Sequence, residues 1–564
     1  MQGVFYLQNM AEELKQIIES AVRSAAEKKG WEVPETFEVR LERPRQAGHG
    51  DWATNTAMQL AKVFGTKPRD LAESIIASLP KNDIIANVEV AGPGFMNFKL
   101  ASAWIAETIK NAIECGKDYG RIDAGHGRKV QIEFVSANPT GPLHMGHGRG
   151  AAVGDITASI LSFAGWNVER EYYVNDAGLQ MELLGKSAQA RYFEALGRAS
   201  EAPMPEDGYH GEYLEDIAKR FVEKYKDSLA NKPLEETQEL FTKETADIVL
   251  DMIKKDLDDF RVHFDVWFSE KSLYDQKAID SALDALKARD YAYEQDGALW
   301  FRSTAFGDDK DRVLIRTNGV PTYFMSDVAY LKNKYDRGFE KLIYVWGADH
   351  HGYIPRIKSV NKAFGYADDA LDVLLIQMVN LLRDGKPVQM SKRAGTIITL
   401  REIMDEVGTD ATRFFFIMRR CDSTLDFDLE LAKKATSENP VYYVQYAYAR
   451  ICSIYRQLEE PGIKLPEISE LDVSKLTEQS ESNLVKAISR LPEEIGKAAE
   501  ELAPHRLAYY ATEIAEAFHA FYNDQKVIGQ DEALMKSRLL LLEATRITLG
   551  NVLGLLGISA PEKM

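Results

Sequence analysis

Residues 130–165 read VQIEFVSANPTGPLHMGHGRGAAVGDITASILSFAG, and this stretch decides the fold class. VQIEFV predicts a strand, the Gly- and Pro-rich segment SANPTGPLHMGHGRG predicts a turn, and AAVGDITASILSFAG predicts a helix. A strand, a turn and a helix in this order make one unit of a doubly wound sheet. The sequence therefore predicts an α/β protein with a Rossmann-type core.

Further strands of that sheet are expected downstream. NVEREYYV predicts a strand at 167–174 and KLIYVWG a third one at 341–347, while DVLLIQMVNLL at 372–382 fits a later strand or a buried helix. Two intrusions separate these segments. Residues from about 185 to 262 are polar and helical, and residues from about 265 to 320 mix strand with turns. We interpret both as insertions into the α/β core.

The flanks of the core read as separate units. Residues 1–115 combine expected helices at 10–28 and 71–78 with the strand-like NVEVAGPGFMNFKL, which predicts a small α+β domain. Residues 401–564 are helical with little interruption and predict an all-helical bundle. The chain is therefore expected to have three domains, with the catalytic core and its insertions at 116–400.

Composition narrows the class of protein. The chain has 564 residues, 45% hydrophobic and 28% charged, so it can bury large cores and is neither disordered nor collagen-like. A formal net charge of −18 argues against nonspecific coating of nucleic acid, and DNA is not an expected partner. The three cysteines form no CxxC pair, so neither a zinc cluster nor a disulfide framework is expected. Because no leader and no long apolar run is apparent, we expect a cytoplasmic protein without a membrane partner.

The motif HMGH at 144–147 is the sharpest local signal, because it lies where a strand turns into a helix. The free N–H groups and the dipole of a helix N-terminus favour an anion, which suits a polyphosphate. Gly146 would let a flat ligand such as adenine approach the backbone. His144 and His147 could donate hydrogen bonds to charge that grows on a phosphate in the transition state. The alternative interpretation is a pair of ordinary turn histidines.

A second signal is the polar loop PVQMSKRAGT at 387–396. Its Lys392 could cover a triphosphate and stabilise the departing pyrophosphate as a point charge. By itself such a segment is more often a basic surface loop. Together with HMGH, it describes one binding site filled from two halves of a doubly wound sheet.

These two segments resemble the HIGH and KMSKS signatures of the class I aminoacyl-tRNA synthetases. Segments along nearly the whole chain narrow the resemblance to the arginyl-tRNA synthetases. They are GDWATN, VEVAGPGFMNFKL, EFVSANPTGPLHMGH, YYVNDAG, DGYHGEYLEDIA, TYFMSDVAYLK, VWGADHHGY, NPVYYVQYAYARICSI and LGISAPEKM. The resemblance implies an N-terminal unit that contacts the outer corner of the tRNA and a helical domain that binds the anticodon.

The resemblance also assigns residues to the substrates. Glu133, Tyr323 and Asp327 would surround the guanidinium group of arginine, whose five N–H donors suit carboxylates, and Asn138 would hold the polar end of the amino acid. Catalysis and nucleotide binding would involve His144, Gly146, His147, Gly347, Asp349, Met390, Ser391 and Lys392. Two structural alternatives remain: Glu133 as a paired buried carboxylate, and Tyr323 with Asp327 as an i, i+4 helix contact.

The implied reaction joins L-arginine to tRNA(Arg) in two steps. ATP activates arginine to arginyl-adenylate with release of pyrophosphate, and arginine then moves to the terminal ribose of the tRNA. The protein supplies position and charge rather than a nucleophile, so no covalent enzyme intermediate is needed. Mg²⁺ would accompany ATP, and no structural metal is expected. The resemblance also implies that activation requires bound tRNA, and we expect a monomer.

The signatures are incomplete in this chain. Gln389 and Arg393 replace the first lysine and the last serine of KMSKS, and Thr140 and Gly141 lie before HMGH where a lysine is absent. Some phosphate stabilisation would then fall to Lys392 or Arg393. We interpret the change as tolerated and leave Gln389 out of the site.

The segment NPVYYVQYAYAR offers residues that suit RNA. Tyr446 and Arg450 could stack on unpaired bases and contact phosphates. Aromatic residues at helical spacing are mostly packing residues, so most tyrosines of this segment are expected in the core.

Three other functions fit the sequence less well. A cysteinyl-tRNA synthetase would need a thiolate–zinc site, which three scattered cysteines do not supply. A non-catalytic tRNA-binding relative should have lost His144, His147 or Lys392, and all three are present. A small HxGH nucleotidyltransferase would leave the two flanking domains without a role.

Overall fold

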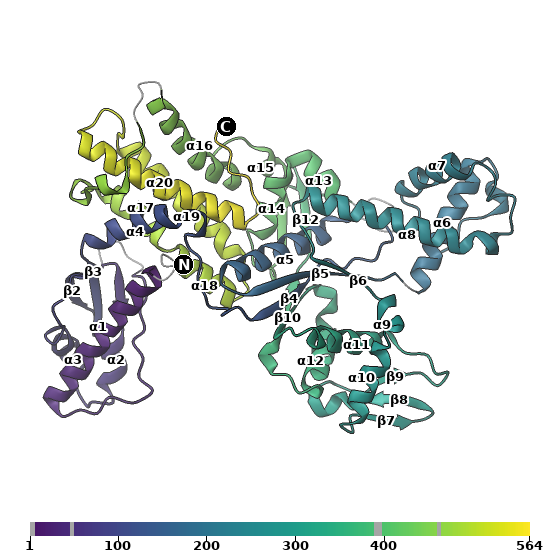
Figure 1. Cartoon of the computed structure of the whole chain (residues 1–564), viewed down its shortest axis with the longest axis horizontal. Coiled ribbons are helices and arrows are strands. Elements are labelled where there is room, and N and C mark those ends of the chain that lie inside the picture. Colours follow the sequence, from purple (N-terminus) through teal and green to yellow (C-terminus); the bar gives the residue numbers. More distant parts are fainter. Residues whose placement is uncertain (1–5, 45–49, 177, 389–397, 460–463) are drawn as a thin grey trace.

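The computed structural model describes residues 6–44, 50–176, 178–388, 398–459 and 464–564. A parallel sheet lies at the centre of the molecule (Figure 1). An N-terminal lobe and a helical bundle lie on one side of it in that view, and two excursions of the chain extend on the other. The predicted multidomain α/β architecture is confirmed.

The central sheet has the strand order β11-β10-β4-β5-β6, and all its neighbours pair in parallel. Its strands are β4 (Lys129–Glu133), β5 (Asn167–Val174), β6 (Val266–Ser269), β10 (Lys341–Gly347) and β11 (Leu371–Ile376). The chain runs outward from β4 to β6 and then returns to place β10 and β11 on the other side of β4. The strand order therefore reverses between β4 and β10, and ligands of doubly wound sheets bind at such a point, beyond the carboxyl ends of the strands.

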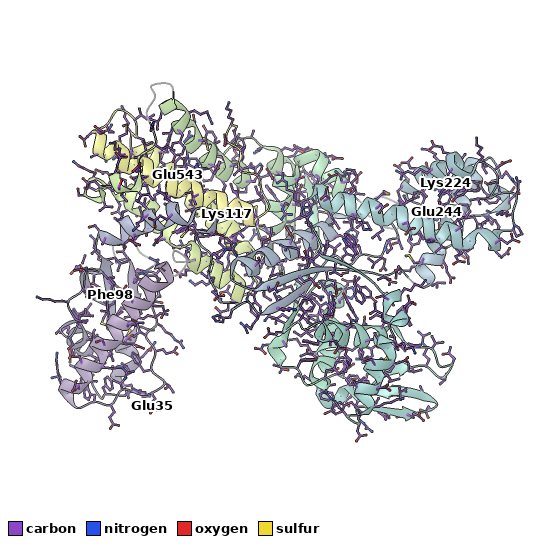
Figure 2. The ribbon with its side chains drawn as sticks, in the orientation of Figure 1. Glu35, Phe98, Lys117, Lys224, Glu244 and Glu543 are labelled. Atoms are coloured by element: carbon purple, nitrogen blue, oxygen red, sulfur yellow. The ribbon has the colours of Figure 1, made fainter. Side chains whose placement is uncertain are left out.

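The first excursion is a helical module between β5 and β6. It contains α6 (Leu179–Ala195), α7 (Tyr213–Tyr225) and α8 (Leu234–Asp259), and it projects to the right in Figure 1. Lys224 of α7 and Glu244 of α8 lie within this module (Figure 2) and form an ion pair of 2.9 Å. The module is thus a compact unit whose helices contact one another.

The second excursion differs from the expected insertion at 265–320. Its first strand, β6, pairs with β5 and belongs to the central sheet. The segment then forms α9 (Lys271–Asp275), α10 (Ala278–Lys287) and the antiparallel strands β7 (Ala292–Gln295), β8 (Ala298–Phe301) and β9 (Arg312–Ile315). The crossover closes with α11 (Tyr323–Asp336), and α12 (Ile354–Ala363) connects β10 to β11.

The segment after β11 links the sheet to the bundle. DVLLIQMVNLL forms two strands, β11 and β12 (Val379–Arg383), rather than a buried helix. It is followed by β13 (Lys386–Pro387), α13 (Leu400–Val407), α14 (Thr409–Ile417), β14 (Leu425–Asp428) and α15 (Leu429–Lys433). β14 pairs in parallel with β12, so the stretch after residue 401 that reads as helical contains a strand of a small sheet.

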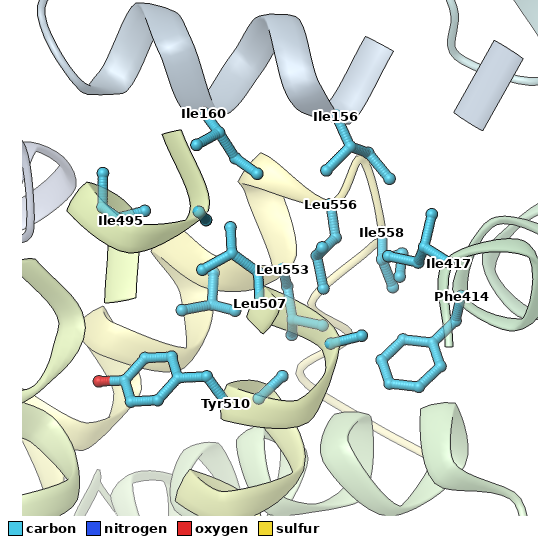
Figure 3. Packing of buried hydrophobic residues seen from close by; sticks show 14 of the residues in the cluster. Ile156, Ile160, Phe414, Ile417, Ile495, Leu507, Tyr510, Leu553, Leu556 and Ile558 are labelled. Atoms are coloured by element: carbon cyan, nitrogen blue, oxygen red, sulfur yellow. The ribbon is translucent and has the colours of Figure 1, made fainter. Parts of the chain in front are cut away.

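The C-terminal region is a bundle of long helices, as expected. It comprises α16 (Pro440–Glu459), α17 (Gln479–Ser489), α18 (Leu491–Glu500), α19 (His505–Asp524) and α20 (Glu532–Leu555). Ile156 and Ile160 of α5 (Met145–Phe163) lie against Leu553 and Leu556 at the end of α20 (Figure 3). The helix that follows HMGH therefore shares one hydrophobic core with the bundle.

The N-terminal lobe pairs helices with a small antiparallel sheet of order β1-β3-β2. Its elements are α1 (Tyr6–Lys29), β1 (Trp52–Thr54), α2 (Thr56–Ala61), α3 (Pro68–Ile76), β2 (Ile85–Ala91) and β3 (Phe95–Leu100), and α4 (Ala103–Cys115) follows. Phe98 marks the buried face of β3 (Figure 2). Two ion pairs, Arg43 with Glu493 and Asp51 with Lys486, join the lobe to the bundle.

Candidate active site

The HMGH turn forms the N-terminus of α5. His144 is the N-cap residue, and its Nδ1 accepts a hydrogen bond from the Gly146 N–H at 3.1 Å. The His144 N–H points in turn to Nδ1 of His147 at 3.4 Å, and the two rings stack with centroids 3.7 Å apart. Since Nδ1 is the acceptor in both neutral rings, Nε2 carries the proton and can donate. A Cβ on Gly146 would lie 3.1 Å from the His144 ring, so glycine keeps this turn tight.

The described residues that follow the MSKR segment lie beside this turn. Gln389, Met390, Ser391, Lys392 and Arg393 lie outside the described residues. Thr399, just beyond them, forms an antiparallel bridge with His144, and the Leu400 N–H donates to the Leu143 carbonyl at 2.8 Å. The chain that follows that segment is therefore anchored to the HMGH turn.

A strained turn connects β4 to the HMGH turn. Val135 and Ser136 have φ angles of 66° and 41°, in the left-handed region that a β-branched residue rarely adopts. Such a conformation costs about 1–3 kcal/mol per residue and is usual at functional sites. The Ser136 hydroxyl donates to Glu133 at 3.0 Å and accepts from the Tyr173 N–H at 3.1 Å. These bonds hold the turn against the carboxyl ends of β4 and β5.

A cluster of acidic side chains, Asp327, Glu133 and Glu270, lies between the sheet and α11. The Asp327 carboxylate accepts a hydrogen bond from the Tyr353 hydroxyl. Burial, together with the charges of Glu133 and Glu270, raises the pKa of Asp327 to about 7. Burial also raises the pKa of Glu270, which is hydrogen-bonded to Tyr173. Two carboxylates whose ionised forms are disfavoured make this acidic cluster suited to a cation.

Glu133, expected at the guanidinium group, is a paired buried carboxylate in this structure. Lys334 of α11 donates to it at 2.5 Å, and both side chains are buried. The Lys334 ammonium group lies over the rings of Tyr330 and Tyr344, and burial lowers its pKa. The lysine balances Glu133, so Asp327 and Glu270 are the carboxylates best placed to attract an added positive charge.

The remaining expected residues follow α11, β4 and β10 as the structure places them. Tyr323 is 68% exposed and lies one helical turn before Asp327. The Asn138 amide donates to Gln180 of α6 at 2.7 Å. Gly347 ends β10 beside β4, and Asp349 follows it with an exposed carboxylate 3.6 Å from His350 Nε2. Asn138, Gly347 and Asp349 thus come at or after the carboxyl ends of β4 and β10, the two strands between which the strand order reverses.

Glu270, Tyr173 and Lys334 were missed by the sequence interpretation. Glu270 directly follows β6, which is where functional carboxylates of parallel sheets are found. The sequence places the short β6 within an expected insertion, so its pattern does not single out Glu270. In the described parts of the chain, no cluster of three or more His, Cys, Asp or Glu side chains could hold a metal ion.

The bundle presents an aromatic platform on α16 and α19. The Arg450 guanidinium lies over the rings of Tyr446 and Tyr522, at 4.4 and 4.7 Å from their centroids. Tyr522 is 36% exposed, and Tyr446 is half-buried. Tyr448 is buried and accepts a hydrogen bond from Arg546, so it serves packing. Flat, partly exposed rings with a guanidinium group suit nucleic acid bases.

Three family models match the chain in order. The arginyl tRNA synthetase N terminal domain matches residues 12–100, and the catalytic domain of the class I (R) tRNA synthetases matches residues 108–428. The DALR anticodon binding domain matches residues 444–564. Among the described helices, none combines the length and apolar character needed to span a membrane.

Relatives of known sequence and structure agree with these matches. An arginine–tRNA ligase of Bacillus subtilis is 50% identical over 559 residues, which cover 99% of this chain and 100% of the relative. That of Geobacillus kaustophilus is 49% identical over 560 residues, with the same coverage. The arginyl-tRNA synthetase structure of Thermus thermophilus covers 98% of this chain and 100% of its own, with a TM-score of 0.73 at 23% identity, which concerns the fold alone.

Proposed function

The chain belongs to the arginyl-tRNA synthetases and is a class I arginine–tRNA ligase, and from this premise we propose how its residues divide the reaction. The crevice between the carboxyl ends of β4 and β10 holds L-arginine and ATP side by side. The single observation that carries this assignment is the acidic cluster of Asp327, Glu133 and Glu270, because Glu133 ends β4, the strand that leads to the HMGH turn.

Arginine binds with its guanidinium group at the acidic cluster. Asp327 accepts from the guanidinium N–H groups, and Glu270 adds the second negative charge. Glu133, balanced by Lys334, belongs to the cluster and fixes the turn through Ser136. The exposed Tyr323 closes over the guanidinium. Asn138 holds the amino acid's polar end and orients its carboxylate toward ATP.

ATP binds over the N-terminus of α5. The arginine carboxylate attacks the α-phosphorus, the bond to the β-phosphate oxygen breaks, and pyrophosphate leaves. His144 and His147 donate from Nε2 to the phosphate oxygens as charge develops, and Gly146 lets the nucleotide approach the backbone. Gly347 and Asp349 contact the ribose side. Met390, Ser391 and Lys392 cover the phosphates, and Mg²⁺ accompanies them as a counterion.

The tRNA takes arginine from the adenylate. A hydroxyl of the terminal ribose attacks the carbonyl carbon of the mixed anhydride, and AMP leaves. Tyr446 and Arg450 contact unpaired bases on the bundle, and the N-terminal lobe contacts the outer corner of the tRNA. The enzyme acts in the cytoplasm as a monomer, with neither a membrane nor DNA as a partner.

Amino-acid-dependent exchange of labelled pyrophosphate into ATP tests these assignments. The assay covers all twenty amino acids, with and without unfractionated tRNA, and with Mg²⁺ present or chelated. We expect exchange with arginine alone, only when tRNA is present, and loss of exchange on chelation. Exchange that persists without tRNA would show that arginine activation does not require bound tRNA. Exchange that persists without a divalent cation would remove Mg²⁺ from the scheme.

A further inference from the structure

The turn between β4 and the HMGH motif is braced from two sides. On the sheet side, the Tyr172 hydroxyl donates to the Ala137 carbonyl at 2.8 Å, and the Tyr173 N–H donates to Ser136. Residues 135 and 136 hold positive φ angles, and such strain persists only where the surroundings over-determine the backbone. The residues of the turn from 138 to 143, which lead to His144, are held by other contacts.

The α6–α8 module holds this part of the turn. The Tyr213 hydroxyl donates to the Thr140 carbonyl at 2.5 Å, and the Tyr209 and Thr140 side chains are hydrogen-bonded to each other. Gln180 accepts from the Asn138 amide at 2.7 Å. A Cβ on Gly141 would already lie 3.4 Å from the Tyr213 ring, so the turn and the ring are in contact. Three side chains of the insertion therefore reach the turn upstream of HMGH.

The loop that carries the two tyrosines is itself fixed to the module. The Tyr209 N–H donates to the buried Ser187 hydroxyl of α6 at 2.9 Å. A Cβ on Gly208 would lie 2.8 Å from the Pro205 carbonyl oxygen, so only glycine allows this path of the chain. Tyr213 begins α7, and burial raises its pKa, so its hydroxyl remains a hydrogen-bond donor. The contact to Thr140 thus comes from a rigid support.

We propose that Tyr213 is a positioning residue for amino acid activation, with Tyr209 and Gln180 as its auxiliaries. Tyr213 acts on the backbone at Thr140 and so sets the path of the chain between Asn138 and His144. Gln180 fixes the orientation of the Asn138 amide. The insertion then serves the chemical step directly, in addition to any contact it makes with RNA. This inference rests on the proposed roles of Asn138 and His144.

The test compares Tyr213→Phe with Tyr192→Phe. Tyr192 is a fully buried tyrosine of the same module, and its hydroxyl donates to the Lys226 carbonyl at 2.6 Å, away from the turn. Each variant loses one hydroxyl–carbonyl hydrogen bond, so similar decreases in Tm are expected. For Tyr213→Phe we expect kcat/KM for arginine in pyrophosphate exchange to fall about fivefold, the net value of one such bond. Tyr192→Phe should change it less than twofold.

Gln180→Leu separates the effect of the insertion on the Asn138 side chain from its effect on the backbone at Thr140. We call these contacts of Tyr213, Tyr209 and Gln180 with the turn the brace. Because Gln180 is hydrogen-bonded to the Asn138 side chain, its loss should raise KM for arginine and leave kcat nearly unchanged. Tyr213→Phe should lower kcat as well, since it releases the backbone leading to His144. Equal kcat/KM values for Tyr213→Phe and Tyr192→Phe would overturn the proposal.

A third variant distinguishes failure of this inference from failure of the proposed site. His147→Ala should abolish most exchange whether or not the brace matters. If His147→Ala loses activity while Tyr213→Phe matches Tyr192→Phe, the site stands and the brace is refuted. If His147→Ala retains full activity, the proposed site itself is refuted, and the brace with it.

Discussion

Arg413 and Asp155 form an ion pair in the interior, with guanidinium Nη2 2.6 Å from carboxylate Oδ2. The other guanidinium nitrogens donate to main-chain carbonyls, Nε to Leu556 and Nη1 to Phe260, each at 2.9 Å. Arg413 lies on α14, Asp155 on α5, Leu556 at the end of α20 and Phe260 at the end of α8. The fully buried Arg413 side chain therefore connects α5, the helix that begins at the HMGH turn, with both the bundle and the α6–α8 module.

Arg413→Met should be strongly destabilising, because the buried Asp155 carboxylate keeps Arg170 but loses this partner, and the carbonyls of Leu556 and Phe260 lose their donors. The expected cost is about 3–5 kcal/mol of the free energy of unfolding. Denaturant unfolding at neutral pH measures it, with Arg420→Ala as the control. Arg420 is exposed and pairs with Asp422 on the surface, so its loss should cost well under about 1 kcal/mol. Equal midpoints for the two variants would contradict this account.

Arginine affinity should depend on the ionisation of Asp327. Its raised pKa, about 7, means that a growing fraction of free enzyme carries a protonated Asp327 as the pH falls below 7. A protonated carboxyl cannot pair with guanidinium, so KM for arginine should rise by up to about tenfold per pH unit below 7 and level off above it.

Asp327→Asn should raise KM for arginine at high pH and flatten its dependence on pH near 7. Asp336→Asn provides the control, because Asp336 lies on the same helix and pairs with Lys332 at the surface. Pyrophosphate exchange at saturating ATP, run from about pH 6 to 8.5, gives both profiles. A wild-type KM that is constant across this range would exclude Asp327 as the titrating partner.

His147→Ala should lower the rate of adenylate formation with little effect on arginine binding. The loss of one donor to the developing charge is worth about 2–4 kcal/mol of transition-state stabilisation. His126→Ala, at an exposed position, should have the activity of the unmodified enzyme. Single-turnover measurement of adenylate formation separates the chemical step from product release. A large increase in arginine KM with unchanged kcat would assign His147 to ground-state binding instead.

The platform of Tyr446 and Arg450 should affect tRNA and not arginine. Tyr446→Ala should raise KM for tRNA in aminoacylation about tenfold, since stacking of a base on an aromatic ring is worth about 1–3 kcal/mol. The arginine KM at saturating tRNA should be unchanged. Arg456→Ala serves as the control on the same helix, because its guanidinium contacts the Glu562 carbonyl at 2.9 Å. Equal tRNA KM values for both variants would show that Tyr446 packs within the bundle and does not contact tRNA.

The strand, turn and helix around HMGH could be predicted from sequence because each element carries its own local signal. β4, β5 and β10 are found where the patterns indicate them. β6 could not be recognised in the same way: it has only four residues, and its strand character comes from pairing with β5 at the edge of the sheet. Glu270 was missed as a consequence.

The ion pair between Lys334 and Glu133 could not be predicted because it joins residues far apart in the sequence. Lys334 reads as one of many charged residues on a helix, yet it pairs with Glu133, 201 positions earlier in the chain. No periodicity encodes that contact, because it depends on how α11 packs on the sheet. The pairing of Glu133 with Lys334 therefore emerges only from the fold, whereas the arginine-binding roles of Glu133 and Asp327 come from the family resemblance and stay predictions.

Ile156 and Ile160 lie on the helix that begins with HMGH, and the bundle covers them (Figure 3). A chain cut before α16 would present this apolar stripe to water and self-associate. The central α/β domain and the C-terminal bundle therefore cannot be exchanged independently of each other. A chimaera that takes its helical bundle from a relative must also carry bundle side chains that fit α5. Residues of α5 and of the bundle are therefore expected to have evolved together.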